Sequence, residues 1–200
     1  MLTARGRDRT YNDRTMLILD PTAEYAVPRL ATAARLPTLR KKKIWFLDNQ
    51  GQHWGKGKPV MNPIFLQWQA RLERDFEIDW DYACTEQFTA PFRHGKEKFE
   101  EILNDADAII NGLACCGSGT SAVVHDAIQY ELRGIPTVSL FTDTAVSHAR
   151  AAMMKLGMPE LQILVVSHNI HMFAPVATAE ESVRAADALY PSVAPALALG

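Results

Sequence analysis

Short apolar runs alternate along this chain with segments of helical periodicity, and this alternation limits the folds open to it. The apolar runs predict strands, at residues 43–49, 106–114, 135–142 and 161–168, and alternation of apolar and polar residues predicts another strand at 77–85. Helical spacing of apolar residues predicts helices, at residues 62–76, 95–104, 121–132, 144–156 and 179–189. Strand and helix recur at spacings of roughly 25–30 residues, which is typical of right-handed βαβ units that build a parallel sheet.

The predicted arrangement is an α/β fold with helices on both faces of a mainly parallel sheet of about five strands. Such a three-layer sandwich is flavodoxin-like, and its usual strand order is 2-1-3-4-5. We expect residues 41–175 to form this α/β domain and to carry the catalytic residues. Residues 1–40 predict an extended basic N-terminal arm, and residues 176–200 predict a C-terminal helix and a Pro/Ala-rich tail.

Charge is distributed unevenly along the chain, although the net charge is only −2. Residues 1–43 carry ten Lys and Arg against four Asp and Glu, whereas residues 44–200 carry eleven against nineteen. A basic arm on an acidic body is expected to dock on its own body or on a partner subunit, because opposite charges attract. Nucleic-acid binding is not expected, since the arm lacks zinc-ligand spacing and regular aromatic residues.

Composition and cysteine content narrow the class of protein further. With 48% hydrophobic and 22% charged residues, the 200-residue chain is expected to be globular. No apolar run approaches the ~20 residues of a membrane helix, and the first residues lack the apolar segment of a secretory signal. The three cysteines, two of them adjacent at Cys115 and Cys116, make a poor disulfide framework, so the expected compartment is the reducing cytoplasm.

Polar residues follow several predicted strands at the edge where ligands of open parallel sheets bind. Those expected to hold a polar substrate after the first and fourth strands are Asp48, Asn49, Gln50, Thr142 and Asp143. His168 ends the last predicted strand at the same edge and is a candidate acid/base residue near neutral pH. Cys84 ends the second strand, at an outer position of the sheet, and is interpreted as structural.

The segment LACCGSGTSAVVHD, residues 113–126, leads from a predicted strand through a thiol and a Gly-Ser-Gly turn into a helix. Unpaired amides at a helix start stabilise negative charge, so Cys116 is expected to ionise readily and to act as a nucleophile. Gly117 and Gly119 let the backbone approach a ligand, and Ser121 is the expected N-cap. A phosphate-binding loop, or a tight turn with buried cysteines, is the structural alternative.

The chain resembles the UGSC family, named for a selenocysteine- or cysteine-Gly-Ser-Cys motif at a strand-to-helix turn. LDPT (19–22), LDN (47–49) and ADAIINGLACCGSGTSAVVHDAIQYELRGIPTVSLFTD (106–143) carry the resemblance, which spans roughly residues 16–172. More distantly, the same half is similar to the selenoprotein B subunits of glycine, sarcosine and betaine reductases. The resemblance implies thiol or selenol chemistry on a small molecule.

The resemblance also implies roles for individual residues. Cys116 falls on the selenocysteine or reactive-cysteine position, and His168 matches a histidine after the last strand. His125 and Asp126 match the His-Asp pair of the following helix, which makes His125 a second candidate acid/base residue. The surrounding motif, and with it the expected substrate-binding loop, is kept at Gly117, Ser118, Thr120 and Ser121.

Two departures from the family motif change the expected chemistry. The second cysteine of the motif is Gly119 here, and the residue before the reactive position, commonly acidic, is Cys115. A Cys-x-x-Cys redox pair is therefore impossible, and neighbouring cysteines rarely form a relaxed disulfide. A nucleophile that forms and releases a covalent adduct without net oxidation fits this motif better.

The predicted function is that of a cysteine-dependent enzyme acting on a small anionic organic substrate, by C–X cleavage, hydrolysis or thiol-dependent reduction. One alternative is a racemase- or decarboxylase-like enzyme without a cofactor, in which Cys84 or Cys115 serves as the opposing thiol. Another is a subunit of a complex with a related chain; a homo-oligomer is equally compatible. No cofactor is expected, and no familiar ligand spacing indicates a metal. His148 has a weaker claim to a role.

Overall fold

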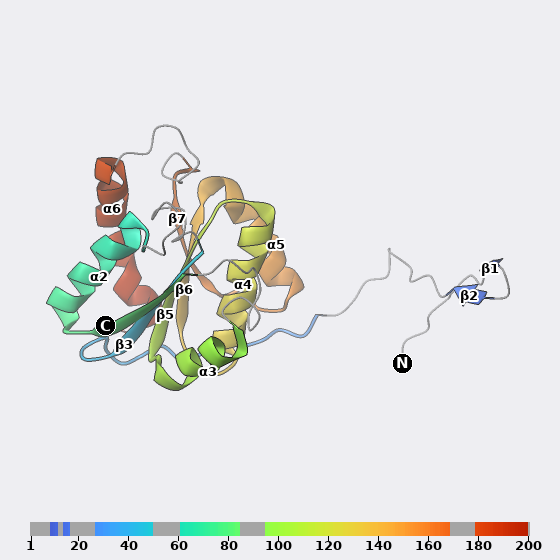
Figure 1. The fold of residues 1–200 in the computed structure, drawn as a ribbon, viewed down its shortest axis with the longest axis horizontal. Coiled ribbons are helices and arrows are strands. Elements are labelled where there is room, and N and C mark those ends of the chain that lie inside the picture. The colour runs from blue at the N-terminus through green and yellow to red at the C-terminus, as the bar shows by residue number, and fades with distance from the viewer. Residues whose placement is uncertain are drawn as a thin grey trace.

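The computed structural model describes residues 27–49, 61–84, 95–168 and 179–199, and the backbone of residues 9–11 and 14–16. Five parallel strands form its main sheet in the order β4-β3-β5-β6-β7 (Figure 1). Their bounds are Lys43–Asp48 for β3, Asp79–Cys84 for β4, Ala108–Ala114 for β5, Thr137–Thr142 for β6 and Gln162–Val166 for β7. This order is the predicted 2-1-3-4-5, and the flavodoxin-like α/β fold is confirmed.

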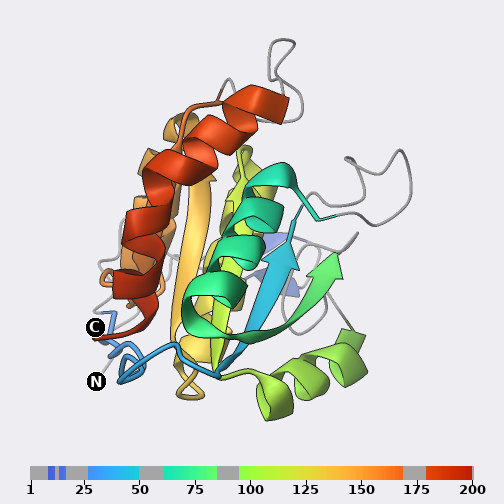
Figure 2. The ribbon, with the colours of Figure 1, turned by 90° about the vertical axis from the view of Figure 1, so that its left-hand side faces the viewer.

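Helices cover both faces of the sheet (Figures 1 and 2). One face carries α2 and α6, whose bounds are Pro63–Phe76 and Ala179–Leu197. The other face carries α3 (Gly95–Asp105), α4 (Gly117–Glu131) and α5 (Val146–Lys155). A short 3₁₀ turn, η1, spans Asp143–Ala145 before α5. The result is the predicted sandwich of helices, sheet and helices.

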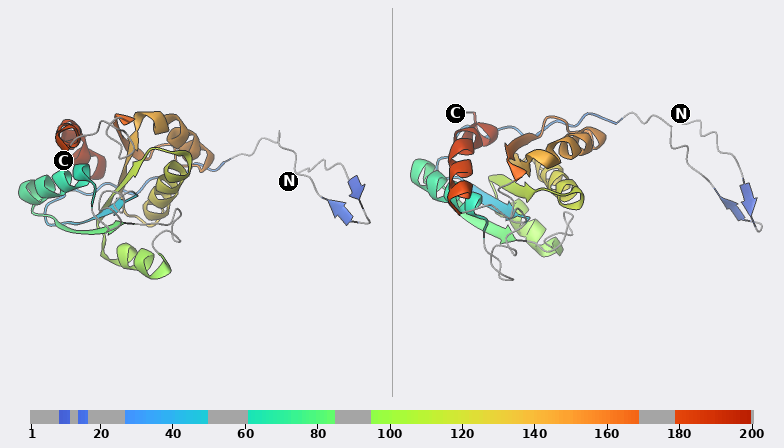
Figure 3. Two further views of the ribbon diagram at one scale, coloured as in Figure 1. Left: turned by 45° about the horizontal axis from the view of Figure 1, so that its top comes forward. Right: turned by 90° about the horizontal axis from the view of Figure 1, so that it is seen from above.

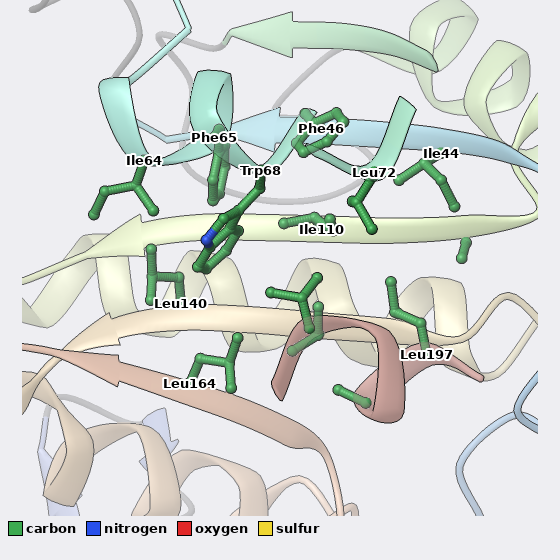
Figure 4. Packing of buried hydrophobic residues seen from close by; sticks show 14 of the residues in the cluster. Ile44, Phe46, Ile64, Phe65, Trp68, Leu72, Ile110, Leu140, Leu164 and Leu197 are labelled. Carbon is green, nitrogen blue, oxygen red and sulfur yellow. The ribbon is translucent and has the colours of Figure 1, made fainter. Parts of the chain in front are cut away.

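The core beneath α2 and α6 holds much of the buried apolar surface (Figure 4). Ile44, Phe46 and Ile110 of the sheet face Phe65 and Trp68 of α2, and all five are fully buried. The indole Nε1 of Trp68 donates a hydrogen bond of 2.9 Å to the backbone carbonyl of Ala186 in α6. The last helix is therefore an integral layer of the sandwich.

Burial along the strands explains why they were recognisable from the sequence. Every residue of β5 and β6 is buried, because helices cover both faces of these inner strands. Their sequences are consequently apolar without strict alternation. β4 and β7 are the two edge strands of the main sheet, and each exposes several side chains.

Three elements differ from the sequence-based prediction. α4 begins at Gly117 rather than at 121, so the Gly-Ser-Gly segment is the first helical turn and not a loop. α6 continues to Leu197 rather than ending at 189, with Pro191 and Pro195 inside it. Burial of its last turns against the sheet offsets the hydrogen bonds that proline cannot make. Strands β1 (Arg9–Tyr11) and β2 (Arg14–Met16) pair in an antiparallel ribbon that no sequence pattern had indicated.

The described part of the N-terminal segment, residues 27–42, docks on the α/β body. The backbone amide of Leu30 donates to the carbonyl of Gly157, and Leu36 forms a parallel bridge with Ala198. Between these contacts lies Glu131, the last residue of α4, whose side chain is fully buried. Docking of this segment on its own body is one of the two arrangements that the charge asymmetry predicted.

The Glu131 carboxylate joins three segments of the chain. It accepts hydrogen bonds from the amide of Ala33 at 2.6 Å and from the guanidinium of Arg35 at 3.0 Å. It also accepts from the backbone amide of Thr137 at 2.7 Å and from the hydroxyl of Thr137 at 2.9 Å. The carboxylate therefore ties the N-terminal segment and the start of β6 to the C-terminal end of α4.

Replacing Glu131 with alanine is expected to lower the free energy of unfolding by about 3–5 kcal/mol. The variant leaves the largely buried guanidinium of Arg35 and the amides of Ala33 and Thr137 without their hydrogen-bond acceptor. The measurement is urea unfolding followed by circular dichroism. The matched control is Glu160→Ala, which removes an exposed ion pair with Arg29 and is expected to cost less than about 1 kcal/mol. Equal losses in the two variants would contradict the role assigned to Glu131.

Candidate active site at the carboxyl edge of the sheet

A β-bulge at the end of β5 sets the direction in which the chain enters the thiol motif. The register between β5 and β6 shifts between Gly112 and Ala114. Gly112 has a φ of +143°, and a Cβ on it would lie 2.6 Å from the carbonyl oxygen of Leu140. Glycine is therefore required here, because no side chain fits this close approach. Bulges of this kind redirect side chains next to functional sites.

Cys116 is the N-cap residue of α4, and its side chain is exposed. Its Sγ lies 3.9 Å from the hydroxyl oxygen of Ser118. The first backbone hydrogen bond of the helix runs from the amide of Thr120 to the carbonyl of Cys116, at 2.8 Å. The amides of residues 117–119 thus precede the hydrogen-bonding ladder of α4, where the positive end of the helix dipole stabilises anions.

Asn49 lies against the same helix start from the end of β3. Its backbone amide donates to the carbonyl of Gly112, and its side-chain amide donates to the carbonyl of Leu113 at 3.4 Å. A Cβ on Gly119 would lie 3.0 Å from Nδ2 of Asn49 and 3.4 Å from Sγ of Cys116. Position 119, where the family motif has its second cysteine, therefore lies between the thiol and the Asn49 amide.

The strand order explains why Asn49 and Cys116 meet. The chain leaves β3 toward β4 on one side, whereas β5 and the later strands extend the sheet on the other side. Ligands of doubly wound sheets bind at such a reversal of strand order, at the carboxyl ends of the strands. The strand arrows in Figure 2 point toward this edge, and the right-hand view of Figure 3 looks onto it.

A second polar group follows β6 and β7. Nδ1 of His168 lies 3.1 Å from the hydroxyl of Thr144, which in turn lies 3.0 Å from the hydroxyl of Thr142. The carboxylate of Asp143 accepts hydrogen bonds from the amides of Thr144 and His168, at 2.7 and 3.1 Å. Asp143 thus holds the end of β7 next to the end of β6, and the two threonines orient the imidazole.

A third polar group, which the sequence analysis did not single out, links α4 to α5. Nε2 of His148 lies 3.0 Å from the hydroxyl of Ser121, and Cε1 of His148 lies 4.0 Å from the position of a Cβ on Gly117. Ser121 is therefore not the N-cap; it is half-buried in the second turn and faces α5. His148 lies early in the predicted helix 144–156, which follows the fourth predicted strand, and this placement was the available sequence signal.

The structure separates several predicted site residues from the thiol. His125 lies eight residues after Gly117, or ~12 Å along the helix axis, and cannot contact Cys116. Asp48, Thr120 and Thr142 are fully buried. The Asp48 carboxylate instead accepts a hydrogen bond of 2.6 Å from the backbone amide at the N-cap of α2. Gln50 lies outside the described residues.

The other two cysteines are less accessible than Cys116. Cys115 and Cys84 are both half-buried, and none of the three cysteines is in a disulfide. Cys84 ends the edge strand β4, where it pairs in register with Asp48 of β3. Burial raises the pKa of Tyr82, two residues before Cys84, and the nearby Cys84 and Asp48 add to this shift. Cys84 therefore lies across β3 from the strand that leads to Cys116, as its outer position predicted.

Within the ranges that the structure describes, no three His, Cys, Asp or Glu side chains come together as candidate metal ligands. No helix in these ranges has both the length and the apolarity needed to cross a lipid bilayer.

Comparison with known proteins identifies a family. The model of the UGSC family matches residues 17–198 of this chain, which is nearly its whole length. Among curated proteins, none matches the chain significantly. The similarity to selenoprotein B subunits stays a prediction.

Among solved structures, the crystal structure of azoreductase from Bacillus anthracis str. Sterne matches with a TM-score of 0.40 and 12% sequence identity. The match covers 75% of this chain and 99% of that one. At this level of identity the match concerns the fold alone.

The position of Gly119 gives a direct test of the thiol geometry. In Gly119→Cys, the new Cβ starts 3.4 Å from Sγ of Cys116, so we expect an intrachain disulfide to form under mild oxidation after a small shift of Asn49. The measurement is the number of free thiols and the mass of proteolytic fragments. In the control Gly117→Cys, the two cysteines are adjacent in sequence and are expected to stay reduced. Similar oxidation of both variants would contradict the geometry.

Proposed function

Because this chain belongs to the UGSC family and exposes a thiol at the N-cap of α4, we propose that it is a cysteine-dependent enzyme. Cys116 would form a covalent adduct with a small anionic organic substrate. The observation that carries the proposal is the position of Cys116, next to helix amides outside the hydrogen-bonding ladder and beside the Asn49 amide. An exposed sulfur among such donors has both access to a ligand and a means to stabilise negative charge.

The proposed reaction has two steps. The Cys116 thiolate attacks an electrophilic carbon of the substrate and forms a C–S bond, while the electron pair of the broken C–X bond leaves with X as an anion. Water or an external thiol then attacks the same carbon and releases the product, and the sulfur recovers its electron pair. Water gives a hydrolytic outcome, and an external thiol gives a thioether. Reduction takes a second thiol, which attacks the sulfur of that thioether: the carbon leaves with the electron pair and takes up a proton, and the two thiols are oxidised to a disulfide.

The donors around Cys116 support stabilisation of an anion in these steps. The amides of residues 117–119 precede the hydrogen-bonding ladder of α4, and the Cβ position of Gly119 lies 3.0 Å from Nδ2 of Asn49 and 3.4 Å from Sγ of Cys116. Amides held in place by a helix and a strand need no reorganisation when charge develops on a leaving group or a carbonyl oxygen. Gly119 contributes no side chain here, so no cysteine at position 119 can form a disulfide with Cys116.

Two histidines are proposed for proton transfer. His168 was predicted from the sequence, and its imidazole is oriented by Thr144. His148 approaches the first turn of α4 from α5 and is oriented by Ser121. Either imidazole can donate a proton to the leaving group near neutral pH. His125 is not proposed for this role, because it lies too far along α4.

The proposal extends to compartment and assembly. Three cysteines without a disulfide favour the reducing cytoplasm, where Cys116 stays available as a nucleophile. A homo-oligomer, or a complex with a related chain, is proposed from the sequence analysis alone.

Alkylation with iodoacetamide, followed by intact mass and peptide mapping, tests the nucleophile. We expect the first label to enter Cys116, at least about tenfold faster than Cys115 or Cys84, because it is exposed and lies at a helix N-terminus. Cys116→Ser should abolish the fast phase and keep the circular dichroism spectrum of the folded protein. The matched control is Cys115→Ser, in which the fast phase should remain.

A fast phase that survives in Cys116→Ser, or that disappears in Cys115→Ser, would assign the reactive sulfur elsewhere and reject the proposal. Substitutions at the two histidines separate their roles once the thiol is established. The histidine that transfers the proton should change the pH profile of turnover when replaced by glutamine, whereas the other should leave that profile in place.

A further inference from the structure

A groove of about 390 Å³ runs between α4 and α5, on the face of the sheet opposite α2 and α6. Its polar walls are formed by Ser121 and His125 of α4 and by His148 and Lys155 of α5. Ala151 and Ala152 line it between these side chains, and their small size leaves the space open. A groove of this volume is within the range of small-molecule sites.

The groove lies along the helix that carries the thiol at its N-cap. Gly117, Ser121 and His125 follow one another at intervals of four residues and therefore share one face of α4. His148 bonds Ser121 on this face, and its Cε1 lies 4.0 Å from the Cβ position of Gly117. The residues that line the groove begin at Ser121, about one helical turn after Gly117.

Two polar side chains of this groove have no partner within the described ranges. There, the side chains of His125 and Lys155 form no hydrogen bond or ion pair, and no carboxylate lines the groove. Lys155 therefore brings a positive charge that no acidic residue of the lining balances, although residues 44–200 carry an excess of eight acidic residues. Such a lysine attracts small anions.

We propose that this groove binds the acidic group of a short organic anion, a carboxylate or a phosphate ester. Ser121, His125 and His148 would donate hydrogen bonds to its oxygens, and Lys155 would supply the positive charge. The groove starts about one helical turn after Gly117, the residue that follows Cys116.

The connection to catalysis rests on the proposed function, whereas anion binding does not. If Cys116 is the nucleophile, the groove selects substrates that carry an acidic group a few bonds from the electrophilic carbon. If Cys116 is not the nucleophile, the same side chains still form the anion site. Binding and reactivity are therefore tested with different variants.

The test is a titration of the full chain with succinate and, separately, with inorganic phosphate, followed by NMR of the histidine side chains. We expect saturable shifts of the His125 and His148 resonances. Lys155→Ala should weaken binding about tenfold, which is the expected effect of losing one charge-assisted contact. The matched control is Arg150→Ala, which removes a positive charge from the same helix outside the groove and should change affinity less than about twofold.

Each outcome has a defined meaning. Preferential binding of succinate supports a carboxylate ligand, preferential binding of phosphate supports a phosphate ester, and binding of both supports the anion site as proposed. Absence of saturable shifts, or equal weakening by Lys155→Ala and Arg150→Ala, would overturn the inference. Binding should persist unchanged in Cys116→Ser, so failure of the cysteine chemistry leaves this result intact.

Discussion

The reversal of strand order at β3 is the constraint on which the candidate site depends. Because β4 and β5 lie on opposite sides of β3, the segments that follow β3 and β5 diverge and leave room above the sheet. Asn49 and Cys116 come from these two segments and meet around Gly119. No local property of either segment would bring them together. Pairing of the parallel strands in this order does so, and the buried apolar strands enforce that order.

Helix α4 holds the thiol of the candidate site at this edge of the sheet. Its N-terminal end carries Cys116, and its C-terminal end carries Glu131. The buried Glu131 carboxylate fixes the far end of the helix to β6 and to the N-terminal segment. The bulge at Gly112 fixes the near end. A helix anchored at both ends can hold its first amides in place beside the thiol, which is what stabilisation of a developing charge requires.

Two glycines at this edge differ in whether the backbone leaves room for a side chain. Gly112 is dictated by the backbone, since the carbonyl of Leu140 leaves no space for a Cβ. Gly119 is not dictated in this way, because a side chain there would meet only the Asn49 amide and the Cys116 thiol. The departure from the family motif at Gly119 therefore has a chemical effect: no cysteine stands at this position to pair with Cys116.

The sequence by itself determined the five strands, their order and the placement of Cys116 at a strand-to-helix turn, because buried parallel strands are continuous apolar runs and the Gly-rich turn is local. Only the tertiary structure decided which polar residues surround the thiol. It buried Asp48 against the N-cap of α2 and brought His148 to Ser121. It also started α4 at Gly117 and carried α6 past Pro191, against local propensity. These outcomes depend on packing between segments far apart in the chain, which the spacing of residues does not encode.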